Sequence, residues 1–347
     1  MRLSIFSVQD HYPGRDRTVP ELYDQVIAQA ELAERLGYDT FFVAEHHFHE
    51  YGAVPNPAVM LSTLAQRTRR LRLGSAISIL TFHHPLTVAE SYAMVDVLSG
   101  GRLTLGVGSG YLRHEFEGYR IDPAEKRERF DENLAVLKRA LAGERITFDG
   151  RYTKLESVQI NVLPVQRPVP VYVAILNKLG AYHVGRQGNA ILCVPYASAD
   201  RFDEIGPMIA EYRKGRAEAG LAAADDDGAY CFHTHVAETD EQCRREAAEA
   251  FDLYVATRLY AKRQVYDDIL RSGLGLFGSV ETVVDKMVRM HEMGVRHVLT
   301  LQNFGLMRPE LVHNSMRLMA EKVLPRVRRR LAGGRIVSSP AAAAAGR

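Results

Sequence analysis

Residues 40–48 read TFFVAEHHF, an apolar run that changes abruptly into a carboxylate and two imidazoles. The run 40–44 predicts a short strand that is buried on both faces, as strands are in a parallel sheet. Glu45, His46 and His47 therefore follow at the point where the strand ends. Because ligands bind at the carboxyl ends of the strands in α/β folds, this stretch predicts a parallel sheet and an active site together.

The alternation of apolar strand and amphipathic helix continues on both sides of this stretch. Strands are predicted at 3–8, 40–44, 71–80, 102–107, 169–175, 190–194, 230–238 and 298–301. Helices are predicted at 20–36, 57–67, 85–98, 125–141, 179–186, 201–219, 241–261, 280–293 and 309–327. Eight strand-then-helix units favour an α/β fold of the (β/α)8 TIM barrel type with insertions. A doubly wound open sheet is the alternative, but no glycine-rich dinucleotide fingerprint follows the first strand.

Residues 1–330 are expected to form a single barrel domain with two insertions. The first, at about 146–163, carries an Asp-Gly turn between β-prone residues and predicts a hairpin. The second, at about 262–278, contains three glycines between two helices and predicts a mobile loop. The tail 331–347 is rich in Ala, Gly, Ser and Pro, which predicts disorder.

The composition is that of a soluble globular protein. The chain has 347 residues, of which 46% are hydrophobic and 25% charged, and its net charge of +2 suggests neither a nucleic-acid surface nor a membrane surface. Three cysteines argue against a disulfide framework, and Cys243, among charges on a predicted helix, is expected to be a surface thiol. No signal-peptide core or run of transmembrane length is recognisable, so a cytoplasmic location is expected.

The histidines after the second strand allow two interpretations. Two imidazoles separated by one residue, His47 and His49, lie on one side of an extended chain, and with Glu45 or Glu50 they resemble a metal site. A metal-dependent barrel hydrolase would need further ligands at later strand ends. The ends of strands four to six offer no His or Asp, so the ligand set looks incomplete. The other interpretation of each histidine is a partly buried residue whose ring is satisfied by hydrogen bonds.

Small residues mark the ends of the next strands. Gly74–Ile77 and the run 103–111, LTLGVGSGY, let a flat ligand approach the backbone, although tight packing inside the barrel explains the first of them equally well. Arg127 begins a helix and could meet a phosphate, or could form a surface salt bridge. Asn177 opens another helix, where free N–H groups could hold an anion and where Asn is also a common N-cap.

Together these segments resemble the bacterial luciferase-like family of flavin-dependent oxidoreductases. The resemblance extends to about Arg328 and depends on the order and strand phase of several short motifs. These are AEHHF at 44–48, GSA at 74–76, HP at 84–85, LSGGRL at 98–103, GVGSGY at 106–111, the segment 127–134, PVYVA at 170–174 and GSVE at 278–281.

The resemblance implies an FMN-dependent TIM barrel, usually a homodimer, that receives reduced FMN from a separate flavin reductase. Reduced flavin would react with O2 to give a C4a-peroxyflavin, which oxidises a small or medium-sized organic substrate. His46 matches the family's catalytic histidine, a proton donor or acceptor beside the flavin. Ala76 and Ile77 match the segment under the isoalloxazine, which often contains a non-proline cis peptide bond.

The resemblance also assigns cofactor-binding positions after strands four and five. They are Gly108, Ser109, Arg127, Leu176, Asn177 and Lys178. Arg127 matches a phosphate-contacting arginine, whereas Gly108 and Ser109 stand where luciferase has a Cys-Arg pair. Asn177 and Lys178 would supply an amide and a cation where many relatives have hydroxyls.

Three alternatives stay open. The first is an F420-dependent dehydrogenase of the same fold, which the run 45–48 and the late glycine-rich loop disfavour. The second is the metal-dependent hydrolase. The third is a flavin-binding barrel without catalytic activity, against which His46 argues. The aromatic residues near strand ends are consistent with a pocket for a hydrophobic substrate and equally with core packing.

Overall fold

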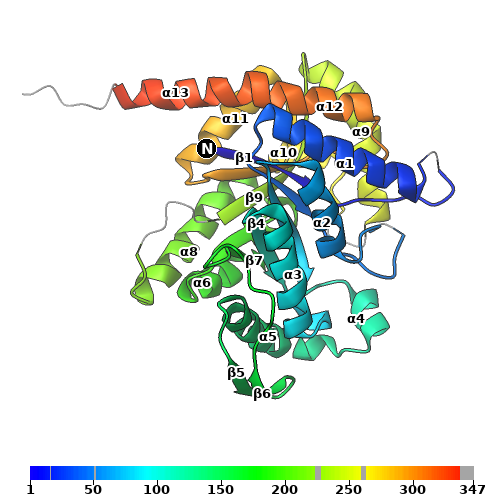
Figure 1. The fold of residues 1–347 in the computed structure, drawn as a ribbon. Coiled ribbons are helices and arrows are strands. Elements are labelled where there is room, and N and C mark those ends of the chain that lie inside the picture. Colours follow the sequence, from blue (N-terminus) through cyan, green and yellow to red (C-terminus); the bar gives the residue numbers. More distant parts are fainter. Residues whose placement is uncertain (16, 51, 223–227, 259–262, 337–347) are drawn as a thin grey trace, which may run out of the picture.

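The computed structural model describes residues 1–336 except for residues 16, 51, 223–227 and 259–262. Eight parallel strands close into a ring at its centre (Figure 1), since β9 pairs with β11 on one side and with β8 on the other. The ring consists of β1 (Arg2–Ser7), β2 (Thr40–Val43), β3 (Arg72–Ile79), β4 (Leu103–Gly108), β7 (Val171–Ile175), β8 (Ala190–Cys193), β9 (Gly228–Ala237) and β11 (His297–Leu301). The predicted (β/α)8 barrel is confirmed, and all eight predicted strands belong to the ring.

Helices surround the ring on its outer side (Figure 1). The first begins where the side chain of Thr18 accepts a hydrogen bond from the N–H of Glu21, and it ends at Gly37, which has left-handed backbone angles. The α-helices are α1 (Val19–Leu36), α2 (Pro57–Arg67), α3 (Pro85–Ser99), α4 (Arg113–Tyr119), α5 (Lys126–Leu141), α6 (Lys178–Arg186), α7 (Pro195–Ser198), α8 (Ile205–Glu218), α9 (Asp240–Thr257), α10 (Tyr266–Ser272), α11 (Val280–Glu292), α12 (Pro309–Arg317) and α13 (Leu324–Ile336). Short 3₁₀ turns are η1 (Leu80–Phe82), η2 (Pro123–Glu125) and η3 (Phe202–Glu204), and a π-helical segment, η4 (Leu318–Val323), joins α12 to α13.

The segment predicted as a mobile loop at 262–278 contains regular structure. Residues 266–272 form α10, and β10 (Leu276–Ser279) pairs in parallel with the second half of β9. The loop prediction is therefore wrong for these residues, because Leu276 and Phe277 are buried and continue the sheet beyond the ring. Residue 262 itself lies outside the described residues.

Other additions to the barrel are found near the predicted places. β5 (Ile146–Asp149) and β6 (Lys154–Val158) form the predicted antiparallel hairpin beside α5 (Figure 1). Helix α4, between β4 and α5, was not predicted. Helix α13 runs to residue 336, so the prediction of disorder is wrong for residues 331–336, and residues 337–347 lie outside the described part.

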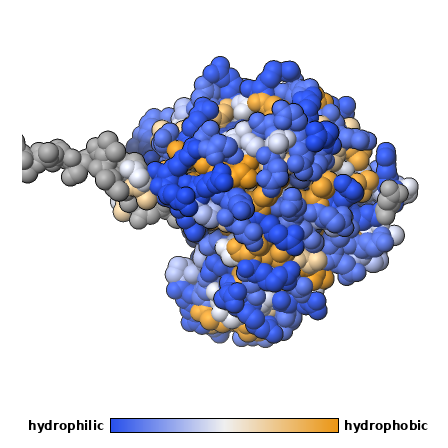
Figure 2. Space-filling model, turned by 90° about the horizontal axis from the view of Figure 1, so that it is seen from above, coloured by the Kyte–Doolittle hydropathy of each residue, from blue (hydrophilic) through white to orange (hydrophobic). Residues whose placement is uncertain are grey.

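The core fills the ring and the space between the ring and its helices. Cys243 belongs to this core, so its assignment as a surface thiol is wrong; α9 turns this side chain inward, where its Sγ donates to the carbonyl of His235 at 3.2 Å. The surface is mainly hydrophilic with scattered apolar side chains (Figure 2). Among the described helices, none combines the length and the apolar character needed to cross a membrane.

Helices α6 and α8 pack closely at Gly215 of α8, and this contact gives a testable prediction. A Cβ atom on Gly215 would lie 2.1 Å from the carbonyl oxygen of Tyr182, whereas one on Gly206 in the same helix would lie 3.8 Å from Met293. We expect Gly215→Ala to lower the free energy of unfolding by roughly 2 kcal/mol, because the helices must move apart. In urea denaturation the matched control Gly206→Ala should cost nothing. Equal losses for the two variants would contradict this account of the contact.

Candidate active site

A cavity opens at the carboxyl ends of the ring strands. Its walls are mainly apolar, and the polar side chains that reach it come from Glu45, His46, Ser109 and Arg258. The other lining residues are Phe6, Ala76, Ile77, Ile79, Gly110, Tyr111, Ala174, Ile175, Leu176, Leu192, Val194, Ala197 and Leu301. An apolar cavity with a few polar groups is the usual form of a small-molecule site.

His46 is fixed in this cavity by a buried carboxylate. Its Nδ1 lies 3.1 Å from Oε1 of Glu115, which also accepts the backbone N–H of His47 at 3.0 Å. Glu115 belongs to α4 and is fully buried. An ionised carboxylate can accept a hydrogen bond but cannot donate one, so this contact places the imidazole proton on Nδ1 and leaves Nε2 as the basic nitrogen.

The charge state of His46 follows from its surroundings. Burial lowers the pKa of His46, and the nearby cation Arg258 lowers it further, while the hydrogen bond and the charge of Glu115 raise it. Burial dominates, so the pKa lies below its ordinary value. The imidazole is therefore neutral at pH 7, and its suitable role is that of a proton acceptor.

Glu45 organises a second cluster behind His46. Its Oε1 accepts from Nε2 of His47 at 2.9 Å and from Nε2 of His83 at 2.6 Å, and its Oε2 accepts the N–H of Ile79 at 3.1 Å. Nδ1 of His47 lies 3.1 Å from the hydroxyl of Tyr119. These contacts tie the ends of β2 and β3 to α4. The segment that carries His46 is thus held from several sides.

The same cluster bears on the metal-site alternative. Glu45, His47 and His83 are the group of metal-ligand type found among the described residues, with one ligand atom from each within 4.8 Å of the others. The predicted combination of His47 with His49 does not form, because the His49 ring packs 5.4 Å from the ring of His114. Hydrogen bonds among the three residues already account for the closeness of their ligand atoms.

Replacing Glu45 should reveal how much this cluster stabilises the fold. Burial alone would raise the pKa of Glu45, but the hydrogen bonds from His47 and His83 outweigh it and lower the pKa to about 2. The stabilisation is therefore complete above the ordinary pKa near 4.5 and is lost as the pH falls toward 2. We expect Glu45→Gln to lower the free energy of unfolding at pH 7 by roughly 3 kcal/mol.

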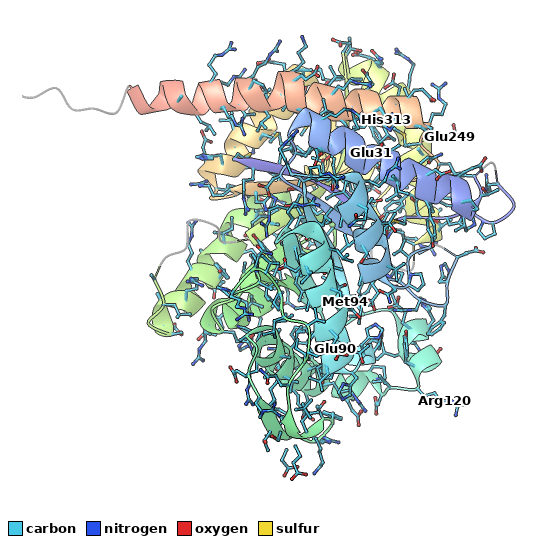
Figure 3. The ribbon with its side chains drawn as sticks, in the orientation of Figure 1. Glu31, Glu90, Met94, Arg120, Glu249 and His313 are labelled. Carbon is cyan, nitrogen blue, oxygen red and sulfur yellow. The ribbon has the colours of Figure 1, made fainter. Side chains whose placement is uncertain are left out.

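Urea denaturation across this pH range measures the effect, and Glu90→Gln on the exposed face of α3 is the control (Figure 3). The wild type should lose its advantage over Glu45→Gln as the pH falls from 4.5 to 2. A difference that stays constant over that range would show that the carboxylate charge contributes nothing.

Four of the residues predicted to bind a cofactor line the cavity: Ala76, Ile77, Ser109 and Leu176. The peptide bond between Ala76 and Ile77 is cis. Gly108 lies against Ile77, since an added Cβ would come within 2.2 Å of the Cδ1 atom of Ile77.

The other four predicted positions, Gly108 among them, are not lining residues of the cavity. Arg127 is half exposed and pairs with Asp131 at 2.8 Å. The side chain of Asn177 caps α6 by accepting the N–H of Gly180 at 2.8 Å, and Lys178 is exposed at the start of that helix. Arg127 thus forms the surface salt bridge, and Asn177 the N-cap, that were predicted from the sequence as their alternatives to cofactor binding.

Two residues of the site were not found from the sequence. Glu115 lies in a seven-residue helix. The local sequence signal for burial there is the neighbouring apolar residue Phe116, which is buried in the structure. Arg258 follows α9, is 5% exposed and stacks its guanidinium 4.4 Å from the ring centre of Tyr254. A buried arginine at the mouth of a barrel has no periodic signature in the sequence.

Comparison with known proteins is consistent with this geometry. Limonene 1,2-monooxygenase of Rhodococcus erythropolis is 28% identical over 313 residues, which cover 87% of this chain and 80% of that protein. F420-dependent glucose-6-phosphate dehydrogenase of Mycolicibacterium fortuitum is 32% identical over 212 residues, or 58% of this chain and 62% of that one.

Among solved structures, the oxygenating constituent of 3,6-diketocamphane monooxygenase from Pseudomonas putida, in complex with FMN, superimposes with a TM-score of 0.81. That match covers 94% of this chain and 99% of the other at 19% identity, and so shows a common fold. The family profile described as luciferase-like monooxygenase matches residues 1–297. The chain therefore belongs to the luciferase-like monooxygenase family.

Proposed function

We propose that this protein is a monooxygenase that uses reduced FMN and O2 to oxidise a small or medium-sized organic substrate. The observation that carries the proposal is a neutral histidine, His46, held by a buried carboxylate in an apolar cavity at the mouth of the barrel. An apolar site with a basic nitrogen suits a reaction in which a proton must be accepted and water kept out.

The cavity fits a flavin ring by its chemistry. An isoalloxazine is flat, largely apolar and edged with hydrogen-bonding atoms, and the cavity combines apolar walls with His46, Ser109 and Arg258. Ala76 and Ile77 would support the ring, and Gly108, Ser109, Arg127, Leu176, Asn177 and Lys178 are the proposed surroundings of the ribityl phosphate chain. Reduced FMN, when bound, supplies the electrons that activate O2 for transfer of one oxygen atom.

The chain itself contributes three things in this proposal. Nε2 of His46 accepts a proton, and Glu115 stabilises the imidazolium that results. The apolar side chains of Phe6, Leu192 and Leu301 exclude water and favour a hydrophobic substrate. Arg258 places a buried positive charge in the same cavity, where oxygen atoms acquire negative charge during the reaction.

A stopped-flow experiment tests the cofactor and the reaction type. The protein is mixed anaerobically with reduced FMN, O2 is added, and both flavin absorbance and H2O2 are followed. Free reduced flavin releases H2O2 as it is oxidised. A monooxygenase should delay this release, and added substrate should lower the amount of H2O2 because one oxygen atom is transferred to it. Release at the rate of free flavin would count against the proposal.

The F420-dependent dehydrogenase is the second candidate, because a glucose-6-phosphate dehydrogenase of that type is among the relatives. The two candidates differ in a direct measurement. Fluorescence titration with FMN and with F420 should give the tighter dissociation constant for FMN. Binding of F420 alone would transfer the assignment to the dehydrogenase.

We further propose that the protein works as a homodimer served by a separate flavin reductase. Adjacent helices α2 and α3 expose the apolar side chains of Val59, Met94, Val97 and Leu98, and Figure 3 labels Met94. A second copy of the chain could cover this face, as apolar patches of this kind often mark interfaces.

Light scattering should give twice the mass of one chain, and Met94→Lys should shift the protein toward monomer by placing a charge in the interface. Glu249→Lys on the exposed side of α9 is the control (Figure 3). A monomeric wild type, or a dimer that Met94→Lys leaves intact, would contradict the placement of the interface. The reductase is tested separately, since oxidation of substrate should require an added source of reduced FMN.

A further inference from the structure

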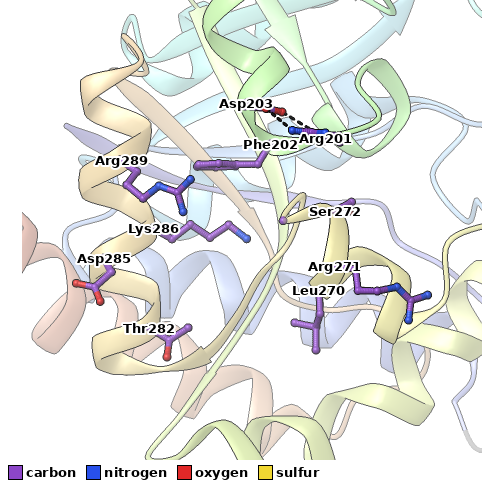
Figure 4. A pocket seen from close by; sticks show the side chains of 11 residues that line it. Arg201, Phe202, Asp203, Leu270, Arg271, Ser272, Thr282, Asp285, Lys286 and Arg289 are labelled. Atoms are coloured by element: carbon purple, nitrogen blue, oxygen red, sulfur yellow. Dashed lines mark hydrogen bonds and ion pairs between the residues drawn. The ribbon is translucent and has the colours of Figure 1, made fainter.

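A second pocket lies on the outside of the barrel, between η3, the end of α10 and α11 (Figure 4). It has a volume of about 690 Å³ and is lined by residues 201–203, residues 270–273 and one side of α11. It shares no lining residue with the cavity that contains His46. Neither the fold nor the proposed oxidation accounts for it.

The charges around this pocket are unevenly paired. Arg201 forms an ion pair with Asp203 at 2.6 Å, and Asp285 is held by Arg330. By contrast, neither Lys286 nor Arg289 makes an ion pair with a carboxylate of any described residue. Asp203 and Asp285 each form an ion pair with another arginine, whereas within the described part of the chain Lys286 and Arg289 have only longer-range attraction, such as that by which Arg289 helps to lower the pKa of Asp203.

The two cations without an ion pair among the described residues lie side by side. Lys286 and Arg289 are three residues apart on α11 and extend toward Phe202 (Figure 4). Nζ of Lys286 lies 5.3 Å from the centre of the Phe202 ring, and the guanidinium carbon of Arg289 lies 5.0 Å from it. Like charges at this spacing destabilise a helix, so neither helix stability nor an ion pair explains why the two cations lie together.

Lys286 is also partly withdrawn from solvent. Its ammonium donates to the carbonyl oxygen of Gly275, and burial, with the neighbouring Arg289 adding to it, lowers the pKa of Lys286 to about 8. A bound anion would favour the charged ammonium and so raise the pKa of Lys286 again. The ammonium retains two further N–H donors for such a ligand.

A glycine at the end of α10 lines the pocket beside Phe202. Gly273 has a φ of +75°, and a Cβ there would lie 3.0 Å from the Cβ of Phe202 and 3.9 Å from Nζ of Lys286. Any larger residue would therefore press on the aromatic floor beside the ammonium. The absence of a side chain therefore lets this backbone lie close to Phe202 and to the ammonium of Lys286.

We propose that this pocket binds a phosphate-bearing small molecule, with Lys286 and Arg289 contacting the phosphate and Phe202 forming the floor. Two adjacent cations match a dianion better than a monoanion, and the planar guanidinium can donate two parallel hydrogen bonds to phosphate oxygens. The volume leaves room for an organic group beyond the phosphate. Free inorganic phosphate and a phosphate ester share this chemistry.

Isothermal titration of the full chain, with FMN present to occupy any phosphate site of the flavin, tests the proposal. The probes are phenyl phosphate, inorganic phosphate and benzoate, the last a monoanion with the same ring as the first. We expect a single site at which phenyl phosphate binds at least about tenfold more tightly than benzoate. Phenyl phosphate binding more tightly than inorganic phosphate assigns the site to an ester, and equal binding assigns it to free phosphate.

Two variants locate the binding in this pocket. Arg289→Gln, at an exposed position that folding should tolerate, and Lys286→Met should each weaken phenyl phosphate about tenfold or more, while Arg317→Gln on α12 should not. The same titrations are repeated without FMN. If the protein fails to bind FMN but still binds phenyl phosphate in this pocket, only the proposed oxidation is contradicted. Absence of binding, equal affinity for benzoate, or affinities unchanged in both variants would overturn the proposal.

Discussion

Replacing His46 with alanine is expected to slow substrate oxidation by roughly 10²–10⁴-fold while changing the dissociation constant of FMN only a few-fold. The reason lies in the hydrogen bond from Nδ1 of His46 to Glu115, which leaves Nε2 as the basic nitrogen of a neutral ring. Alanine removes the proton acceptor but leaves the apolar walls of the cavity in place. The loss should therefore appear in turnover and hardly in binding.

The measurement combines fluorescence titration of FMN with the oxidation rate of the best substrate from a panel of small and medium-sized apolar organic compounds. H2O2 release without substrate adds a second readout, and it should become faster in the variant. The matched control is His49→Ala, which removes the same side chain three residues away and outside the cavity lining. Turnover and H2O2 release that match the wild type would remove His46 from the reaction.

The ring of the barrel was predictable because each strand carries its own signal. The run 40–44 is buried along its whole length, and residues 40–43 of it form β2 between β1 and β3. Strand burial in a parallel sheet depends on residues that are adjacent in the chain, so it can be recognised locally. The position of Glu45 and His46 at the strand end followed from the same signal.

The missed elements depend on contacts between distant segments. β10 has four residues next to several glycines, and it exists because β9 extends beyond the ring and offers a partner. Cys243 looks exposed because its neighbours in the chain are charged, yet α9 turns it toward β9. In both cases the tertiary partner outweighs the local composition.

The most consequential miss in the site is Glu115. Its burial depends on α4 folding back over the segment after β2, where its Oε1 meets both His46 and the N–H of His47. Glu117, two residues along the same short helix, is exposed and pairs with Arg113. Sequence alone gives no reason to separate these two glutamates, and only the first can act on the active site.

Glu115→Gln should therefore change the pH dependence of the reaction in a defined direction. Burial lowers the pKa of His46, and Glu115 opposes that effect, so removing the carboxylate charge lowers the pKa of His46 further. If the neutral imidazole is the active form, the acid limb of the rate profile moves to lower pH. The plateau rate should also fall about 10–100-fold, because no charge remains to stabilise the imidazolium formed during the reaction.

The matched control is Glu117→Gln, which makes the same chemical change on the exposed side of α4 and should leave both the limb and the plateau in place. Rates are measured between pH 5 and 9, together with the FMN dissociation constant, to separate proton transfer from a loosened cavity. A purely structural role for Glu115 would lower the plateau without moving the acid limb. A limb that stays where it is, or moves to higher pH, would therefore show that Glu115 holds α4 in place but does not set the charge of His46.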